Sequence, residues 1–315
     1  MIKKIKKPIL ITGSTGFIGS NILRKFALNN IRTNILIRRN SDTWRINDIL
    51  KRTNVYKVDL RDRKNLSKII EKIKPKTIFH LSTYGAYSHQ DNKNLIKENI
   101  LDATINLLDE CMKYKFNIFI NTGSNSEYGF QNIKMKENIK PNPNSFYSVF
   151  KLASSQYCTF IAKRNKLNII NVRPFHIYGD FEDSSRLIPT LIRNMIKKEK
   201  IYLVDPKIKR DCLYIEDCVD AFLKLAINKH SSGDVYNLGS GSQKSIEQIF
   251  RTVSKELNYN ISPKWSSMEN RLWDQEKWLS DITKIKNNIN WRPKTELKLG
   301  IKKTVKWYKK FFNDK

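Results

Sequence analysis

The sequence has few cysteines for its length. Among 315 residues there are four, and no two of them have the CxxC spacing of a metal or redox site; they are Cys111, Cys158, Cys212 and Cys218. Four cysteines are too few for a disulfide scaffold at this length, and we expect most of them to be small core residues. This usage fits a protein of the reducing cytosol without a metal site.

Long apolar runs are also missing. No segment approaches the roughly 20 apolar residues that cross a bilayer. The start, MIKKIKKPILITG, has the charge of a secretory signal peptide, but only Pro8 to Ile11 are available as its apolar region, which is too short. We therefore expect a cytoplasmic protein without an integral membrane segment, and peripheral contact with a membrane stays open.

Acidic residues are scarce relative to basic ones. Lys and Arg total 59 against 30 Asp and Glu, a formal net charge of +29. Such an excess suggests an anionic partner such as nucleic acid, a membrane surface or a phosphorylated substrate. The lysines are nevertheless spread along the whole chain, with no compact basic arm interleaved with aromatic residues. We expect no nucleic acid partner.

The first half of the chain alternates short β-branched runs with longer amphipathic segments. This alternation predicts an α/β fold in which helices cover a doubly wound parallel sheet of the Rossmann type. The predicted strands are PILIT, TNILI, VYKVD, TIFHLS, NIFINTG and NIINVR, and the predicted helices span residues 17–29, 62–73, 93–114 and 144–165.

The alternation loosens after Arg173, which indicates a smaller mixed lobe interleaved with the last pieces of the sheet. A short strand is predicted near IYLVD (201–205), a helix from Ser245 to about Leu257, and a basic amphipathic helix from about Leu297. We divide the chain into a dinucleotide-binding domain, residues 1–172 and 206–241, and a smaller lobe, residues 173–205 and 242–315.

A glycine-rich turn follows the first predicted strand. PILITGSTGFIGS places Gly13, Gly16 and Gly19 between that strand and the next helix. Glycines permit a tight turn and let the backbone approach a pyrophosphate, while the start of the helix supplies N–H groups. Such spacing also occurs in ordinary βα turns, but its position at the first strand strengthens the dinucleotide interpretation.

A tyrosine and a lysine stand four residues apart in SFYSVFK, within a segment that is predicted to be helical. Residues at this spacing lie on one helical face, so Tyr147 and Lys151 can point into the same cleft. A nearby ammonium favours the phenolate, which brings the pKa of a tyrosine, normally ~10, closer to that of a working acid or base.

Together these motifs resemble the extended short-chain dehydrogenase/reductase family, and the resemblance covers nearly the whole chain. It implies that Ser124, in GSNSEYG, acts with Tyr147 and Lys151 and hydrogen-bonds the reacting oxygen. It also implies an adenine contact by Asp59 and Leu60. The full set of cofactor-binding residues that it implies is Gly13, Gly16, Phe17, Ile18, Gly19, Arg38, Asp59, Leu60, Leu81, Asn99, Tyr147 and Lys151.

Within that family the chain resembles nucleotide-sugar epimerases, dehydratases and ketoreductases. RPFHIYG, RLIPTLI and RDCLYIEDCVDAF match their substrate-side layout. The resemblance implies that Arg210 and Arg271 bind the nucleotide diphosphate, although either is otherwise readily a solvated surface charge. His176 replaces a substrate-side asparagine of the 4-epimerases and is either a substrate contact or a packed histidine. With Asn125, these residues form the expected substrate site.

Two departures narrow the function. The 4,6-dehydratases of this family carry Asp-Glu directly after the catalytic Thr, whereas Asn125 and Ser126 follow Ser124, so we expect no dehydration. The second strand ends in Arg38, where relatives that use NAD carry an acidic residue. Arginine suits a 2′-phosphate, so NADP is slightly favoured over NAD. The alternative is that Arg38 only reflects the basic composition.

The leading hypothesis is an NAD(P)-dependent oxidoreductase that acts at carbon 4 of a nucleotide-diphosphate sugar, as a 4-ketoreductase or 4-dehydrogenase in glycan precursor biosynthesis. The close alternative is a nucleotide-sugar 4-epimerase with retained NAD. A rival of another class is a redox-silent module that binds RNA or a protein. The complete set of Ser124, Tyr147 and Lys151 argues against that rival.

The helices predicted at 93–114 and 144–165 each carry more apolar surface than one face of a sheet covers. The resemblance implies that they pair across a two-fold axis as a four-helix interface. We expect a homodimer.

Overall fold

A seven-stranded parallel sheet forms the larger part of the molecule. The computed structural model describes residues 1–87, 89–131, 133–268 and 277–313. The strand order is β3-β2-β1-β4-β5-β6-β9, which confirms the predicted doubly wound α/β fold. The strands are β1 (Ile9–Thr12), β2 (Thr33–Ile37), β3 (Thr53–Lys57), β4 (Thr77–His80), β5 (Ile118–Thr122), β6 (Ile169–Pro174) and β9 (Val235–Leu238).

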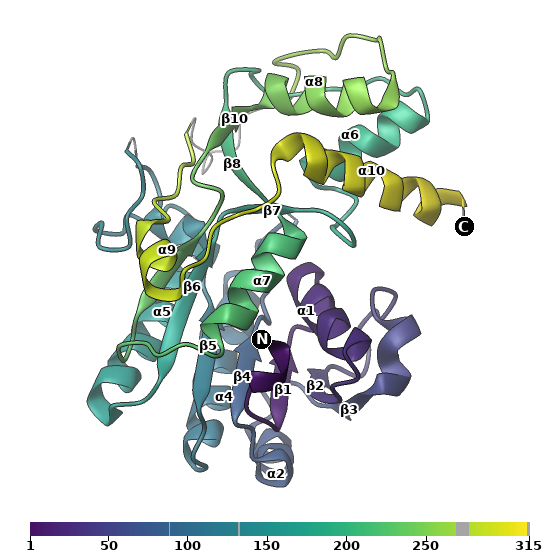
Figure 1. Ribbon diagram of the computed structural model, residues 1–315. Helices are drawn as coiled ribbons and strands as arrows, with labels where there is room; N and C mark the ends of the chain where they lie inside the picture. Colours follow the sequence, from purple (N-terminus) through teal and green to yellow (C-terminus); the bar gives the residue numbers. More distant parts are fainter. Residues whose placement is uncertain (88, 132, 269–276, 314–315) are drawn as a thin grey trace.

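Helices cover both faces of this sheet because successive strand residues point to opposite sides. Ile9 and Ile11 of β1 belong to the core packed by α1 and α7, whereas Leu10 belongs to the core packed by α2, α4 and α5. Figure 1 shows α1 beside α7, in agreement with their mutual contacts. These helices are α1 (Phe17–Leu28), α2 (Arg63–Ile73), α4 (Ala103–Met112), α5 (Phe146–Asn165) and α7 (Ile215–Leu225).

A smaller mixed lobe lies above the large sheet in Figure 1, as predicted. Its three-stranded sheet has the order β10-β8-β7, with β7 parallel and β10 antiparallel to β8, and α6, α8 and α10 pack together beside it. The elements are β7 (His176–Tyr178), α6 (Leu187–Ile196), β8 (Lys209–Tyr214), β10 (Gln243–Ser245), α8 (Ile246–Leu257) and α10 (Leu297–Asn313). Helix α9 (Thr283–Ile289) packs beside β9.

Two expected elements differ in the structure. The helix expected at 93–114 is built from α3 (Lys93–Lys97), a π-helical turn (Glu98–Asp102) and α4. The strand expected near residues 201–205 is wrong, because Tyr202 makes only an isolated bridge with Lys264. Short 3₁₀ turns, three in the described part of the chain, span Ile2–Lys4, Asn47–Arg52 and Asn125–Tyr128, the last labelled η4.

The division of the chain at residues 172, 205 and 241 stays a prediction. Strand β8, within the segment 206–241, pairs in the small sheet, while β9 of the same segment is a strand of the large sheet. Among the helices of the described ranges, none is long and apolar enough to cross a membrane. The carboxyl ends of β1, β4 and β5 meet at one edge of the large sheet, where ligands of such sheets bind.

Candidate active site

The glycine-rich turn connects β1 to α1 at that edge. Gly13 has φ +66°, and a Cβ there would lie 2.5 Å from the backbone carbonyl of Leu81. A Cβ on Gly19 would lie 2.1 Å from the carbonyl oxygen of Gly13. The close approach brings Leu81 against the turn, and the first turn of α1, with Phe17 and Ile18, directs unpaired N–H groups outward. The turn therefore fits a pyrophosphate.

A buried chain of hydrogen bonds holds the strand ends beneath the site. Thr104 donates to the carbonyl of Ile100 and therefore accepts from His80 Nε2 at 2.9 Å, so His80 Nδ1 accepts from Thr12 at 2.7 Å. Ser154 of α5 also donates to Thr104, at 3.1 Å. Burial lowers the pKa of His80 to about 3. The imidazole is thus a neutral link between β1, β4, α4 and α5.

Ser124 follows β5 and caps η4. Its hydroxyl accepts from the amide of Ser126 at 3.1 Å, and its own amide donates to the Glu127 carboxylate at 2.8 Å, which is a capping box. Glu127 is fully buried and pairs with Arg173 of β6 at 2.8 Å. Glu127 was not singled out in the sequence, although Ser-x-x-Glu is the pattern of a capping box.

Tyr147, in the first turn of α5, lies with its hydroxyl in hydrogen-bond contact with Ser124 and Thr83. Burial raises the pKa of Tyr147 above its ordinary value, and the two hydrogen bonds and the charge of Arg186 lower it only in part. The lowering of the Tyr147 pKa that we expected from the Lys151 ammonium is not found, and this ammonium lies 6.0 Å from the centre of the Tyr147 ring. The free protein therefore presents a neutral phenol at pH 7.

Lys151 lies one turn further along α5 and is 4% exposed. Its Nζ donates to the carbonyl of Thr122 at the end of β5, at 2.8 Å. Burial lowers the pKa of Lys151 to about 8, opposed by the negative charge of Glu127. The structure thus brings Ser124, Tyr147 and Lys151 together, as the sequence predicts for a proton-transfer site.

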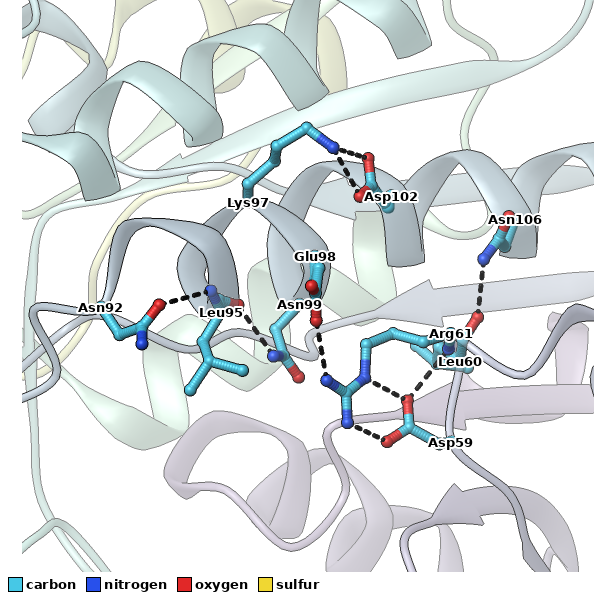
Figure 2. Close-up of polar contacts among 10 residues, drawn as sticks. All are labelled: Asp59, Leu60, Arg61, Asn92, Leu95, Lys97, Glu98, Asn99, Asp102 and Asn106. Atoms are coloured by element: carbon cyan, nitrogen blue, oxygen red, sulfur yellow. Dashed lines mark hydrogen bonds and ion pairs between the residues drawn. The ribbon is translucent and has the colours of Figure 1, made fainter.

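The residues predicted to contact adenine, Asp59 and Leu60, follow strand β3. Arg61 donates to both carboxylate oxygens of Asp59, at 3.0 and 2.8 Å, and to Glu98 at 2.9 Å (Figure 2). The hydrogen bonds of Arg61 hold the pKa of the Asp59 carboxyl below its ordinary value. Asn106 of α4 donates to the carbonyl of Leu60 at 3.0 Å. Arg61, not singled out in the sequence, therefore links this end of the site to the π-helical turn.

Asn99 lies within the π-helical turn, a form of helix that is frequent at functional sites. Its amide donates to the carbonyl of Leu95 at 2.8 Å, and Figure 2 shows it on the same side of the helix as Arg61. A hollow of about 460 Å³ is lined by Asp59, Arg61, Asp62, Glu98, Asp102 and Asn106.

Arg38 lies directly after β2 and lines a second hollow, of about 340 Å³, together with Arg39, Lys57, Asp59 and Arg61. Both hollows share Asp59 and Arg61. The structure thus brings the residue predicted to read the 2′ position beside the residue predicted to contact adenine. Basic side chains predominate in this second hollow.

The predicted substrate residues lie on β7, on β8 and in η4. His176 begins β7, and burial lowers its pKa well below the ordinary value, with Arg210 and Arg186 acting in the same direction. Arg210, on the adjacent strand β8, is buried and donates to the carbonyl of Lys209 at 3.0 Å. Asn125 is buried as the first residue of η4. Arg271 lies outside the described residues.

Arg186 is a further candidate that the sequence interpretation did not single out, although it lies in the quoted segment RLIPTLI. It precedes α6, donates to the carbonyl of Ala86 at 3.2 Å and lies 4.4 Å from the ring centre of Tyr87. Its charge acts on both Tyr147 and His176. Nothing local in the sequence marks it, because its position depends on the packing of the lobe against the segment after β4.

Residues 9–239 match the model of a protein family described as the NAD dependent epimerase/dehydratase family. The chain belongs to this family. This confirms the resemblance to the extended short-chain dehydrogenases/reductases and assigns the protein to NAD-dependent enzymes.

Individual relatives of this family cover nearly the whole chain. The dTDP-glucose 4,6-dehydratase of Haemophilus influenzae is 25% identical over 334 aligned positions, which cover 95% of this chain and 97% of that protein. The CDP-paratose 2-epimerase of Salmonella typhi is 26% identical and covers 95% and 98%. A UDP-glucose 4-epimerase of Thermotoga maritima, solved with UDP-glucose, has a TM-score of 0.89 at 23% identity and covers 97% and 100%, which shows the shared fold.

The role of the buried pair of Glu127 and Arg173 in this epimerase/dehydratase family member can be tested by measuring stability. Glu127→Gln leaves Arg173 as an unpaired buried charge, so the free energy of unfolding should fall by about 3–5 kcal/mol in urea denaturation. Glu247→Gln is the matched control, because Glu247 pairs with Arg251 on the exposed face of α8 at 2.6 Å. Its loss should stay below ~0.5 kcal/mol. Equal losses in the two variants would contradict this role of Glu127.

Lys151 gives a pH-dependent prediction. Because burial lowers its pKa to about 8 in the folded protein, the folded state holds fewer protons than the unfolded state between that value and the ordinary value of 10.5. Lys151→Met should therefore be more stable than the wild type at pH 7, and its advantage should shrink as the pH rises from 8 to 10.5. Urea denaturation of both proteins across this range measures the difference; a constant difference would refute the lowered pKa.

Proposed function

We propose that the protein is an NAD(P)-dependent oxidoreductase that acts at carbon 4 of a nucleotide-diphosphate sugar, as a 4-ketoreductase or, in reverse, a 4-dehydrogenase. The observation that carries the proposal is the contact of Tyr147 with Ser124, backed by the buried ammonium of Lys151. These groups lie at the carboxyl edge of the sheet, on the same edge as the glycine turn.

When bound, the cofactor supplies a hydride acceptor or donor at its nicotinamide. The protein's own residues handle the proton. The neutral hydroxyl of Tyr147 donates a proton to the oxygen on carbon 4 as negative charge develops there, and the hydroxyl of Ser124 hydrogen-bonds the same oxygen. Lys151 stays charged at pH 7 and stabilises the phenolate that forms on Tyr147.

The residues that follow Ser124 argue against dehydration as the net reaction. Elimination of water across two carbons needs a free acid and base beside the sugar ring, and Asn125 and Ser126 offer neither. The nearest carboxylate, Glu127, is fully buried and engaged by Arg173, Ser155 and the amide of Ser124. It has no surface from which to reach a substrate.

The names of the relatives support a nucleotide-linked sugar as the substrate class, because they act on dTDP-glucose and CDP-paratose. This chain offers Arg210 on β8 and Arg186 directly before α6, whose guanidinium groups suit a diphosphate. Arg271 is proposed as a third contact from the sequence resemblance.

The second candidate is a 4-epimerase that retains NAD. Membership of a family described as NAD dependent favours it, because an epimerase restores its cofactor in each cycle. It uses the same Tyr147 first as a base and then as an acid. The neutral phenol of the free protein favours the reductive direction, and the basic hollow at Arg38 favours NADP.

The catalytic role of Tyr147 predicts a loss of turnover without a loss of cofactor affinity. Tyr147→Phe removes the proton donor and should lower kcat by about 10²–10⁴-fold, while the dissociation constant of NADPH stays close to that of the wild type. The control is Tyr157→Phe on the same helix, since Tyr157 bonds Asp109 at 2.7 Å, away from Ser124. Full activity in Tyr147→Phe, assayed with a panel of 4-keto nucleotide sugars, would refute the mechanism.

The cofactor preference is tested at Arg38. Pairing of its guanidinium with a 2′-phosphate is worth roughly 1.5–3 kcal/mol, or about ten- to a hundredfold in affinity. Arg38→Asp should therefore invert the preference from NADPH to NADH, since it repels the phosphate and accepts from the ribose hydroxyls. Titration of dihydronicotinamide fluorescence gives both dissociation constants. A wild type that already prefers NADH would favour the 4-epimerase.

We propose a homodimer through α3, the π-helical turn, α4 and α5. The outer face of α5 exposes Phe146, Val149 and Phe160, and α3 adds Leu95; these side chains are 36–57% exposed. Phe160 stands about three helical turns beyond Val149, so these side chains share one face of α5. Sedimentation velocity at micromolar concentration should show twice the chain mass, and Phe160→Lys should give the monomer. A wild-type monomer would contradict the proposal.

A further inference from the structure

The loop between β7 and α6, residues 179–186, connects the substrate lobe to the cofactor side of the molecule. It begins at Gly179 and ends at Arg186, whose positive charge acts on the pKa of both Tyr147 and His176. Phe181, in its middle, has φ +69°, a conformation that is unfavourable for a residue with a Cβ and persists only where surroundings impose it. Phe181 is held by residues from the dinucleotide-binding part of the chain and by Trp307 of α10, whose ring centre lies 4.8 Å from that of Phe181.

Arg45 is one of the residues that hold Phe181. It lies in the segment that follows β2 and Arg38, and its side chain is 14% exposed. Its Nε donates to the carbonyl of Phe181 at 2.8 Å and its Nη1 donates to the carbonyl of Thr15 at 3.4 Å. Its Nη2 lies 3.9 Å from the Asp183 carboxylate. One guanidinium therefore joins the glycine-rich turn to the loop 179–186.

Helix α1 reinforces this junction. Arg24 donates to the carbonyl of Arg45 at 2.7 Å, and its guanidinium lies 4.3 Å from the ring centre of Phe181. Asn21 donates to the carbonyl of Asp180 at 3.1 Å. The loop 179–186 is therefore attached to the first turns after β1 and β2, and these are the two segments proposed to contact the pyrophosphate and the adenosine ribose.

The far end of the loop is coupled to the reacting groups. The amide of Arg186 donates to the carbonyl of Asp183 at 3.0 Å, so a shift at Asp183 moves the start of α6. The Arg186 guanidinium, held over Tyr87, acts on the pKa of both Tyr147 and His176. A continuous run of contacts thus leads from Thr15 through Arg45, Phe181 and Asp183 to Arg186.

We infer that Arg45 is a positioning residue that couples cofactor binding in the glycine-rich turn to the position of Arg186 in the substrate site. The inference rests on the proposed function. A dinucleotide that orders the turn at Thr15 and the segment after Arg38 fixes both sides of Arg45. The fixed guanidinium then holds the loop 179–186 in the arrangement that aims Arg186 at the substrate. By linkage, the nucleotide sugar strengthens cofactor binding to the same degree.

Hydrogen exchange with mass spectrometry tests the coupling without knowledge of the sugar. The probes are NADPH and NADH, each added at saturation to the whole protein. In the wild type, binding should slow the amides of residues 13–19 directly and those of residues 179–186 by about fivefold or more, the lower range of measured couplings. In Arg45→Met, the slowing at 13–19 should persist and the slowing at 179–186 should vanish.

Two further variants separate this role from a merely structural one. Arg32→Met is the matched control, because Arg32 also donates to a backbone carbonyl, that of Lys51 at 3.2 Å, within the dinucleotide-binding part. It should keep both effects. Arg45→Lys keeps the charge but has one donor group that cannot reach both carbonyls, so it should lose most of the effect at 179–186. If Arg45→Met does not fold, Arg45→Lys serves as the test variant in its place.

The outcomes are distinguishable. If neither probe slows residues 13–19 in the wild type, the proposed cofactor binding is wrong and the coupling is overturned with it. If residues 13–19 slow and 179–186 do not, only the coupling is overturned. Equal cofactor-dependent slowing of 179–186 in the wild type and both Arg45 variants overturns the role of Arg45. A purely structural role would speed exchange of the loop equally with and without cofactor.

Discussion

The buried ion pair between Glu127 and Arg173 is the constraint on which the candidate active site depends. A buried carboxylate is tolerated only when its oxygens are engaged, and Glu127 is engaged on three sides: by Arg173 of β6, by Ser155 of α5 and by the amide of Ser124. Gly123 makes room for it, since a Cβ there would lie 2.2 Å from the carboxylate. One carboxylate thus sets the relative positions of Ser124 and of the helix that carries Tyr147 and Lys151.

The carboxylate of Glu127 also acts on the charge of Lys151. Its negative charge partly offsets the burial of Lys151, whose pKa falls only to about 8, so the ammonium persists at neutral pH. Tyr147 lies outside this pair, and burial dominates its titration. The arrangement keeps a charged lysine beside a neutral phenol, which is the state that a proton donor needs before reduction of a ketone.

Local patterns in the sequence predict what depends on local geometry. The strand and helix alternation, the glycine turn at Gly13 and the shared helical face of Tyr147 and Lys151 need only their neighbours in the chain. The sequence did not reveal Arg186, or the contact of Arg61 with the π-helical turn, because the partners Ala86 and Glu98 lie far away in sequence. The sequence also did not predict the direction in which the pKa of Tyr147 shifts, because this shift depends on burial, which residue spacing does not reveal. The expected strand near residue 203 failed because its only partner is an isolated bridge.

At the end of the site predicted to bind adenosine, an ion pair changes the local balance of basic and acidic side chains. Both carboxylate oxygens of Asp59 accept hydrogen bonds from Arg61, which donates through its Nε, its Nη2 and its backbone amide. The second hollow is lined by Asp59 and Asp62 on the acidic side and by Arg38, Arg39, Lys57 and Arg61 on the basic side. Once Arg61 has neutralised Asp59, the remaining basic side chains at the ends of β2 and β3 outnumber the remaining acid. A dianion placed there meets basic side chains at two strand ends. At this hollow the basic excess of the sequence, +29 overall, therefore persists after the pairing of Asp59.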